Sequence, residues 1–186
     1  MISIVDDIGT VVQSMRNGGG YEPYFEDAYE NDGAPYYFIG HRREISNRLS
    51  DMALRPISKK KRFPLIALNT MSINPTVRGG VWDFNLNIVI GTQVDINLST
   101  EEREAQIFKP ILIPIYDAFK NAFGESGLGF MWDSTIDQLA PPHTPMIKYF
   151  WGTEDKEGSI KNIFNDPMCA IELVNFKFSK QDLVNV

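Results

Sequence analysis

The stretch that decides the fold is residues 81–123, which reads VWDFNLNIVIGTQVDINLSTEEREAQIFKPILIPIYDAFKNAF. Its first part, residues 81–94, predicts a strand because apolar and polar side chains alternate with a period of two. Residues 101–123 predict a helix because their apolar side chains recur every three or four positions. A short connection joins the two elements. The pattern indicates an α/β or α+β domain in which apolar faces pack against each other.

The predicted strand has an apolar face and a polar face. The apolar face holds Trp82, Phe84, Leu86, Ile88 and Ile90, and the polar face holds Asp83, Asn85 and Asn87. One buried face and one wet face are typical of a half-buried antiparallel strand. The apolar run is continuous over residues 88–90, which predicts burial on both faces there. The polar face either meets water or contacts another subunit, and both interpretations stay open.

The predicted helix carries a start signal and two interruptions. Ser99 is followed three residues later by Glu102, the capping-box arrangement that satisfies backbone N–H groups at a helix start. Pro110 and Pro114 each remove a backbone donor and crowd the preceding turn. The sequence therefore predicts a kink there, or a break into two helices. Gly124 is the expected C-terminal stop.

The remaining elements follow from the same periodicities. Helical spacing of apolar residues predicts helices over residues 2–15 and 42–54. Short apolar or alternating runs predict strands over residues 36–41, 63–69, 146–151 and 170–178.

These elements predict an α+β fold, with a mainly antiparallel sheet packed against two principal helices and with extended loops. Residues 1–186 are expected to form a single domain. Its core is expected in residues 1–123 together with the C-terminal strand 170–178. Residues 124–158 are expected to be a loop-rich insertion, because glycine and proline are frequent there.

The charge of the chain is acidic and unevenly distributed. Its 186 residues carry a formal net charge of −6, and the sequence pI is near 4.9. Dedicated nucleic-acid binders usually carry a basic excess, so this balance argues against that class. Residues 1–62 hold nine basic and nine acidic side chains, whereas residues 63–186 hold nine and fifteen. The acidity therefore belongs to the second part of the chain.

The expected compartment is a cytoplasm. Cys169 is the only cysteine, so an intrachain disulfide is excluded, which agrees with a reducing environment. The first residues include Asp6 and Asp7 and lack a basic region, so they do not resemble a signal peptide. Apolar runs in the sequence are all shorter than a membrane span requires.

Three segments are candidate contact surfaces. The basic run at residues 58–62 offers Lys59, Lys60, Lys61 and Arg62 to nucleic acid, to an acidic partner or to an acidic neighbouring subunit, or it is a solvated loop. Among these interactions we favour the acidic neighbour, because the second part of the chain is acidic. The aromatic-rich segments 21–29 and 130–132 offer Tyr24, Phe25 and Trp132 as interface anchors.

The sequence predicts no catalytic, cofactor or metal site. The glycines at residues 18–20 lack the Gly-Lys-Ser/Thr that a phosphate-binding loop places before its helix. Glu22, Glu26 and Asp27 would form a carboxylate site only if they converged in a pocket, and a segment whose acids face solvent is the favoured explanation.

Two further residue types could carry chemistry, and both have a structural explanation. His41 is expected to be an ordinary histidine at a strand end, since no partner that would orient it as a base is identifiable. Cys169 is expected to be a small buried hydrophobe rather than a nucleophile paired with His143.

Three segments together resemble small structural proteins encoded in tailed-phage genomes. They are FPLIALN at residues 63–69, NLNIVIGT at residues 85–92 and TEEREAQIFKPILIPIY at residues 100–116. The pattern is similar to neck and tail-completion proteins of the tail-terminator type, especially those of phages that infect Bacteroidetes-type hosts. The resemblance covers roughly residues 1–123 and lies in folding residues rather than in chemistry. The matching scaffold positions are Leu65, Ile66, Leu68, Leu86, Ile88, Ile90, Phe108, Ile111 and Tyr116.

The resemblance implies a virion protein, made in the host bacterial cytoplasm, with a sheet packed against two helices. It implies assembly into a sixfold or twelvefold ring that contacts portal-side and tail proteins at the head–tail junction. DNA would pass through the ring without specific binding, and no catalytic residue, cofactor or membrane contact is implied. Residues 124–158 are longer than a minimal terminator requires, so the position within the neck is left open.

Two other classes stay open at the level of sequence. A small enzyme would use a carboxylate cluster such as Glu22, Glu26 and Asp27, and it predicts titratable groups that converge in a pocket. A nucleic-acid adaptor would use the basic run with Tyr36 and Tyr37, and it predicts DNA binding with strong salt dependence. The virion protein predicts oligomers or partner-driven assembly without catalytic activity.

Overall fold

The computed structural model describes residues 4–15, 35–55, 62–69, 76–78, 81–133, 139–151, 153–156, 159–162 and 167–181. Within them the chain forms helices α1 (Ile4–Ser14) and α3 (Arg42–Ala53) and one long helix made of α5 (Thr100–Arg103), η2 (Glu104–Leu112) and α6 (Ile113–Glu125). The strands are β1 (Tyr36–Gly40), β2 (Leu65–Asn69), β3 (Thr76–Arg78), β4 (Val81–Gln93), β5 (Phe130–Met131), β6 (Thr144–Trp151), β7 (Thr153–Lys156), β8 (Ser159–Asn162) and β9 (Met168–Gln181).

The sheet confirms the predicted α+β class. Its strand order is β1-β2-β4-β9-β5, with β3 paired to β4 and β6 paired to β9. β1 and β2 are parallel and are joined through α3, whereas the other pairs of this sheet are antiparallel. β7 and β8 form a separate two-stranded sheet. The mixed character comes from one crossover, since a parallel pair needs a long connection and a helix supplies it.

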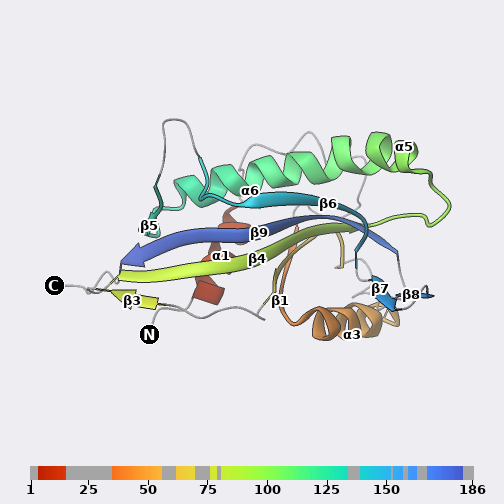
Figure 1. The fold of residues 1–186 in the computed structure, drawn as a ribbon, viewed down its shortest axis with the longest axis horizontal. Helices are drawn as coiled ribbons and strands as arrows, with labels where there is room; N and C mark the ends of the chain where they lie inside the picture. The colour runs from red at the N-terminus through yellow and green to blue at the C-terminus, as the bar shows by residue number, and fades with distance from the viewer. Residues whose placement is uncertain are drawn as a thin grey trace.

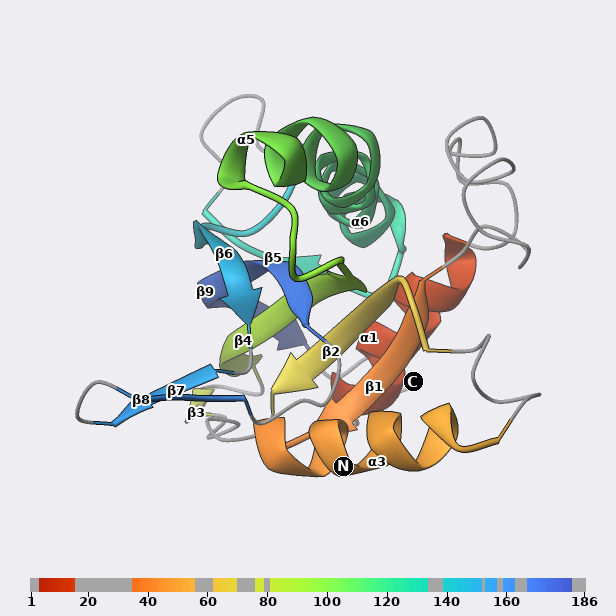
Figure 2. The same cartoon turned by 90° about the vertical axis from the view of Figure 1, so that its right-hand side faces the viewer.

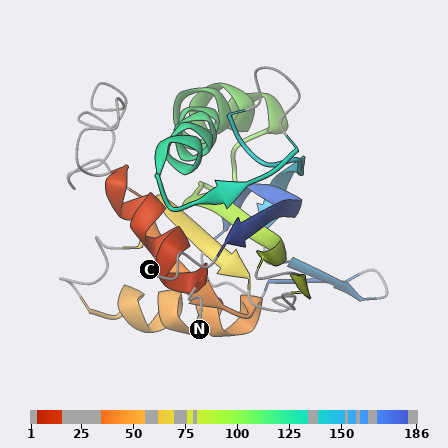
Figure 3. The same cartoon turned by 90° about the vertical axis from the view of Figure 1, so that its left-hand side faces the viewer.

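Helices cover both faces of the sheet. In the described part of the chain three helices pack on it, one more than the two principal helices expected. Figure 1 shows the long helix running along one face and α3 lying against the other. Figure 3 shows α1 beside α6, and buried residues of α1 belong to the same core cluster as those of the long helix. The third helix is needed because the central strands are apolar on both faces.

Each face of the sheet has its own core. The larger core joins α1 and the long helix to the side chains that alternate along β4, including Phe84, Leu86 and Ile88. The smaller core joins α3 to the opposite faces of β1, β2 and β9, with Phe38, Ile45, Leu49, Leu65, Val89, Trp151 and Met168. The predicted period of two in β4 is therefore confirmed, and so is the double burial around Val89.

A bulge divides the β4–β9 pair into two halves. The register shifts between Leu86 and Ile88 of β4. Opposite this point Asn175 adopts a positive φ of 56°, a conformation that asparagine tolerates better than most residues. The Asn175 backbone N–H donates to Oδ1 of Asn87 at 3.3 Å, and Nδ2 of Asn85 donates to Oδ1 of Asn175 at 3.4 Å. Polar side chains of the open face thus support the irregular backbone.

The long helix begins as predicted but passes its prolines without a break. Ser99 and Glu102 form the reciprocal capping box. The predicted break at Pro110 and Pro114 does not occur, because residues 104–112 adopt a π-helix that continues directly into α6. In this pattern hydrogen bonds span five residues, and Arg103 and Phe108, five residues apart, are both fully buried. The π-helix therefore accommodates Pro110 without ending the helix.

Gly124 does not end the helix, which continues to Glu125. A Cβ atom at Gly124 would lie 2.5 Å from the carbonyl oxygen of Leu139, so the glycine is needed for close approach of two backbones. The region expected to be a loop-rich insertion, residues 124–158, supplies β5 and β6 to the main sheet. It is thus part of the sheet architecture as well as a connection.

Candidate functional site

A groove lies at the end of the sheet where β5, β9 and the start of β4 meet. It has a volume of about 350 Å³. Its lining combines polar and aromatic side chains, and consists of Asp83, Phe84, Asn85, Trp132, Asp133, Pro142, Lys177, Phe178 and Ser179. Among the described residues this is the feature that best fits a binding site, because it is concave and mixes apolar walls with a few polar groups.

The groove forms because two short partners share one edge of β9. β5 pairs with β9 at Ser179 and Lys180, whereas β6 pairs with β9 only as far as Val174. Between these partners the backbone N–H of Lys177 donates to the carbonyl oxygen of Pro142 at 3.2 Å. The strand edge is therefore covered at both ends, and a hollow remains between them.

Polar groups of the groove come from the open face of the β4–β9 pair and from the residue after Trp132. The Ser179 hydroxyl donates to Oδ1 of Asp83 at 2.6 Å, which orients that carboxylate. Asp133 and Lys177 are exposed. Among the described residues, neither Asp83 nor Asp133 forms a salt bridge. Two carboxylates and one ammonium group thus give the groove one net negative charge.

An aromatic cluster supports one wall of the groove. Trp132 packs on Phe123 with ring centroids 5.7 Å apart, and Phe123 stacks on Phe130 at 4.3 Å. Phe123 also meets the edge-on ring of Phe178 at 5.2 Å. Nε1 of Trp132 is buried and, within the described part of the chain, has no hydrogen-bond partner. Trp132, a predicted interface anchor, is therefore a half-buried wall residue held by the core.

A tyrosine and a histidine join the long helix to the segment before β6. The His143 Nδ1 atom lies 2.7 Å from the carbonyl oxygen of Pro141, which can only accept, so Nδ1 carries the proton. In the neutral ring Nε2 is then the acceptor for the Tyr116 hydroxyl at 2.8 Å. Burial lowers the pKa of His143 and raises the pKa of Tyr116. Neutral partners are favoured, and the pair acts as a structural link.

Arg103 is a fully buried cation at the other end of the sheet. Its guanidinium donates to the carbonyl oxygens of Leu98 at 2.9 Å, Ile96 at 2.9 Å and Asp95 at 3.3 Å. It also donates to the carbonyl oxygen of Tyr149 at 3.0 Å. These contacts tie the β4–α5 connection to β6. The sequence pattern did not single out this arginine, which lies among acidic residues at the start of the helix.

The predicted contact residues are placed unequally. Lys59, Lys60, Lys61, Tyr24 and Phe25 lie outside the described residues, as do Glu22, Glu26 and Asp27. Arg62 is 2% exposed, and its guanidinium lies over the Phe63 ring at 5.4 Å. Arg62 thus packs within its own chain, unlike a side chain in a solvated run.

His41 and Cys169 have the structural roles that their sequence positions suggest. His41 follows β1 directly and caps α3, with Nδ1 accepting from the backbone N–H of Arg43. The capping role itself was not predicted. Cys169 is fully buried in the larger core, which confirms the expectation of a small buried hydrophobe, and burial raises the pKa of its thiol.

Tyr36 and Tyr37 are used in packing. The Tyr37 hydroxyl donates to the carbonyl oxygen of Val5 at 3.0 Å, and burial raises the Tyr37 pKa. Tyr36 packs against the smaller core. Within the described ranges, no group of three or more His, Cys, Asp or Glu side chains could hold a metal ion. No helix in that same part of the chain has the length and hydropathy of a membrane span.

Comparison with known proteins gives no relative for this chain. No family model matches the sequence, and neither the curated proteins nor the solved structures contain a match.

Proposed function

We propose that this chain is a structural subunit of the head–tail junction of a tailed phage. In this role it forms a ring that links the portal side of the capsid to the tail and surrounds the DNA channel. The sequence resemblance supports this kind of assembly. The exposed apolar surface of β6 is the observation that supports self-association.

The exposed apolar surface of β6 supports self-association. Met146 is 40% exposed and Ile147 is 50% exposed, although both belong to a strand of the main sheet. They are adjacent, so they point to opposite faces of the strand. Among the described strands, β6 pairs only with β9. Large apolar side chains on a strand at a sheet edge are typical of a surface that another chain covers.

The β7–β8 hairpin supports the same proposal. Its strands pair with each other and not with the main sheet. Figure 2 shows the hairpin extending away from the body of the molecule. An isolated two-stranded hairpin is at best marginally stable in water, so packing on a neighbouring subunit would stabilise it.

The packing of Tyr36 and Tyr37 favours the ring over a nucleic-acid adaptor. Sequence-tolerant binding of single strands needs aromatic faces that are free to stack on bases. Tyr36 and Tyr37 instead pack against the two cores of this chain. The acidic net charge of −6 points in the same direction, because phosphate contacts need a basic excess.

The proposal is tested by the mass and shape of the purified full-length chain. The subunit mass is 21.1 kDa, so light scattering after gel filtration separates a monomer from a sixfold or twelvefold species. Negative-stain imaging of the same peak then shows whether the species is a closed ring. We expect rings for the wild-type chain, alone or after mixing with the other virion proteins encoded with it.

Paired variants test whether β6 carries the contact. Met146→Lys combined with Ile147→Lys places two charges on the β6 surface and is expected to convert rings to monomers. Leu54→Lys is the matched control, since Leu54 is 83% exposed at the end of α3, and rings should persist. A wild-type chain that remains monomeric both alone and with its virion proteins contradicts the proposed function.

A further inference from the structure

We propose that the groove lined by Asp83 and Asp133 receives the basic run Lys59–Lys61 of an adjoining copy of the chain. This inference rests on the proposed self-association and adds which two surfaces meet. It also assigns an occupant to the groove.

Charge complementarity favours a lysine-rich occupant. Asp83 and Asp133 line the groove together with a single basic side chain, Lys177. In the described part of the chain neither carboxylate forms a salt bridge, and the Ser179 hydroxyl holds the Asp83 carboxylate in place. An incoming ammonium group would form charge-assisted hydrogen bonds, which are about twice as strong as neutral ones. The groove therefore prefers a cation to an anion.

The apolar wall suits the rest of a lysine side chain. Trp132 and Pro142 line the groove beside the carboxylates, whereas the rings of Phe84 and Phe178 are buried in the larger core. A lysine buries its methylene stem against apolar rings while its charged end reaches polar groups. An indole face also attracts a cation directly. The volume of about 350 Å³ lies in the range that accommodates small ligands, so the groove has room for part of an extended basic segment.

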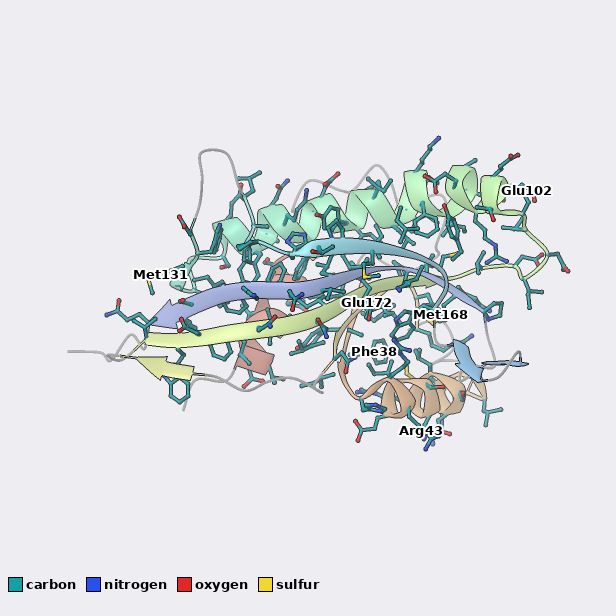
Figure 4. All side chains as sticks on the ribbon, viewed as in Figure 1. Phe38, Arg43, Glu102, Met131, Met168 and Glu172 are labelled. Carbon is teal, nitrogen blue, oxygen red and sulfur yellow. The ribbon has the colours of Figure 1, made fainter. Side chains whose placement is uncertain are left out.

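The groove and α3 lie at different ends of the sheet. The groove is built on the end of β9 that includes Ser179, whereas α3 packs against Met168 at the start of β9. Figure 4 shows Met131 at one end of the sheet and Arg43 of α3 beneath the other part. The lysine run follows α3 in the sequence. A contact between two different surfaces is heterologous, and heterologous contacts are the type that closes rings.

The first test measures binding of a peptide to the full-length protein. The peptide spans residues 55–63, RPISKKKRF, and carries a fluorescent label for polarisation measurements. We expect saturable binding that weakens with salt, and a loss of at least about tenfold in affinity for the variant Asp133→Lys. Glu101→Lys is the matched control, because Glu101 is exposed at the far end of the long helix. A peptide with Lys59→Glu, Lys60→Glu and Lys61→Glu should not bind.

The second test uses charge exchange within the assembled protein. Asp133→Lys should weaken the rings, and combining it with Lys59→Asp, Lys60→Asp and Lys61→Asp should restore them. Asp133 is exposed, so this change leaves the core intact. Asp83→Asn gives an independent check, since it keeps the shape of the side chain that Ser179 contacts.

The two proposals fail in different ways. Rings that form equally well with Asp133→Lys overturn the groove assignment and leave the ring proposal standing. Absence of peptide binding up to about 1 mM, or equal binding by wild type and Asp133→Lys, also overturns it. A protein that never assembles but binds the peptide through Asp133 contradicts the ring and supports the groove as a site for basic segments.

Discussion

The two halves of the β4–β9 pair differ in how many of their faces are covered. Residues Ile88–Thr92 of β4 are all buried, because the long helix covers one face and the core of α3 covers the other. In the half from Val81 to Asn87 only Phe84 and Leu86 are buried. The half from Val81 to Asn87 leaves its polar side chains, Asp83, Asn85 and Asn87, on an open face of the sheet. The candidate groove lies beside this open face.

This difference separates stability from recognition along one continuous strand. The doubly covered half removes every side chain from water and therefore contributes most to the hydrophobic free energy of folding. The singly covered half keeps its apolar side chains in the larger core and frees its other face for polar groups. A surface can change there without loss of the core, which is why a binding groove is tolerated at that end.

The largest expected effect tests the comparison directly. Ile90→Ala removes a fully buried side chain from the doubly covered half, and it should lower the free energy of unfolding by about 2–5 kcal/mol. Asn85→Ala changes an exposed side chain in the other half, so it should cost no more than about 0.5 kcal/mol. Urea unfolding followed by circular dichroism measures both. Equal losses for the two variants would break the comparison.

A smaller effect is expected for the buried arginine that fixes the doubly covered end. Arg103→Leu leaves four backbone carbonyl oxygens without the guanidinium donor that they now share, and it should cost about 1–3 kcal/mol. Arg43→Leu is the matched control at an exposed position of α3. In thermal unfolding, the melting temperature of Arg103→Leu should lie well below those of the wild type and Arg43→Leu. A melting temperature equal to that of the wild type would refute the role of Arg103.

The smallest expected effect is a pH dependence at His143. Its pKa is ordinary, near 6.5, in the unfolded chain and lower in the folded chain, chiefly because of burial. The unfolded chain then binds more protons below about pH 6.5, so the stabilising contribution is complete above that pH and declines as the pH falls.

The free energy of unfolding should therefore decrease from pH 7 to pH 5, and His143→Phe should reduce that decrease. Asn85→Ala removes no titratable group from an exposed position, so it should retain the full slope and serves as the control. A slope unchanged by His143→Phe would show that acid sensitivity arises elsewhere.

Much of the scaffold was predictable because its signals are local. Alternation along β4, the continuous apolar run near Val89 and the Ser99 cap each depend on neighbouring residues, and each is confirmed. The third helix against the sheet is the tertiary consequence of the same apolar run. Local signals therefore give the helices and strands, but not which face of the sheet each helix covers.

The groove and the π-helix were not predictable from local pattern. The groove joins Asp83 to Trp132 and Ser179, residues that come together only because β5 and β6 pair with different parts of β9. At Pro110 the expectation of a break assumed four-residue hydrogen bonds, whereas the wider turn accommodates the ring without losing the helix. Both outcomes depend on tertiary packing, which periodicity does not encode.

The buried thiol of Cys169 makes this chain well suited to site-specific labelling. A fully buried thiol with a raised pKa offers little thiolate to maleimide reagents, and the sequence contains no second cysteine. One cysteine introduced on the surface would thus be the single reactive position in each subunit. Spectroscopic rulers attached there would report the spacing between neighbouring copies.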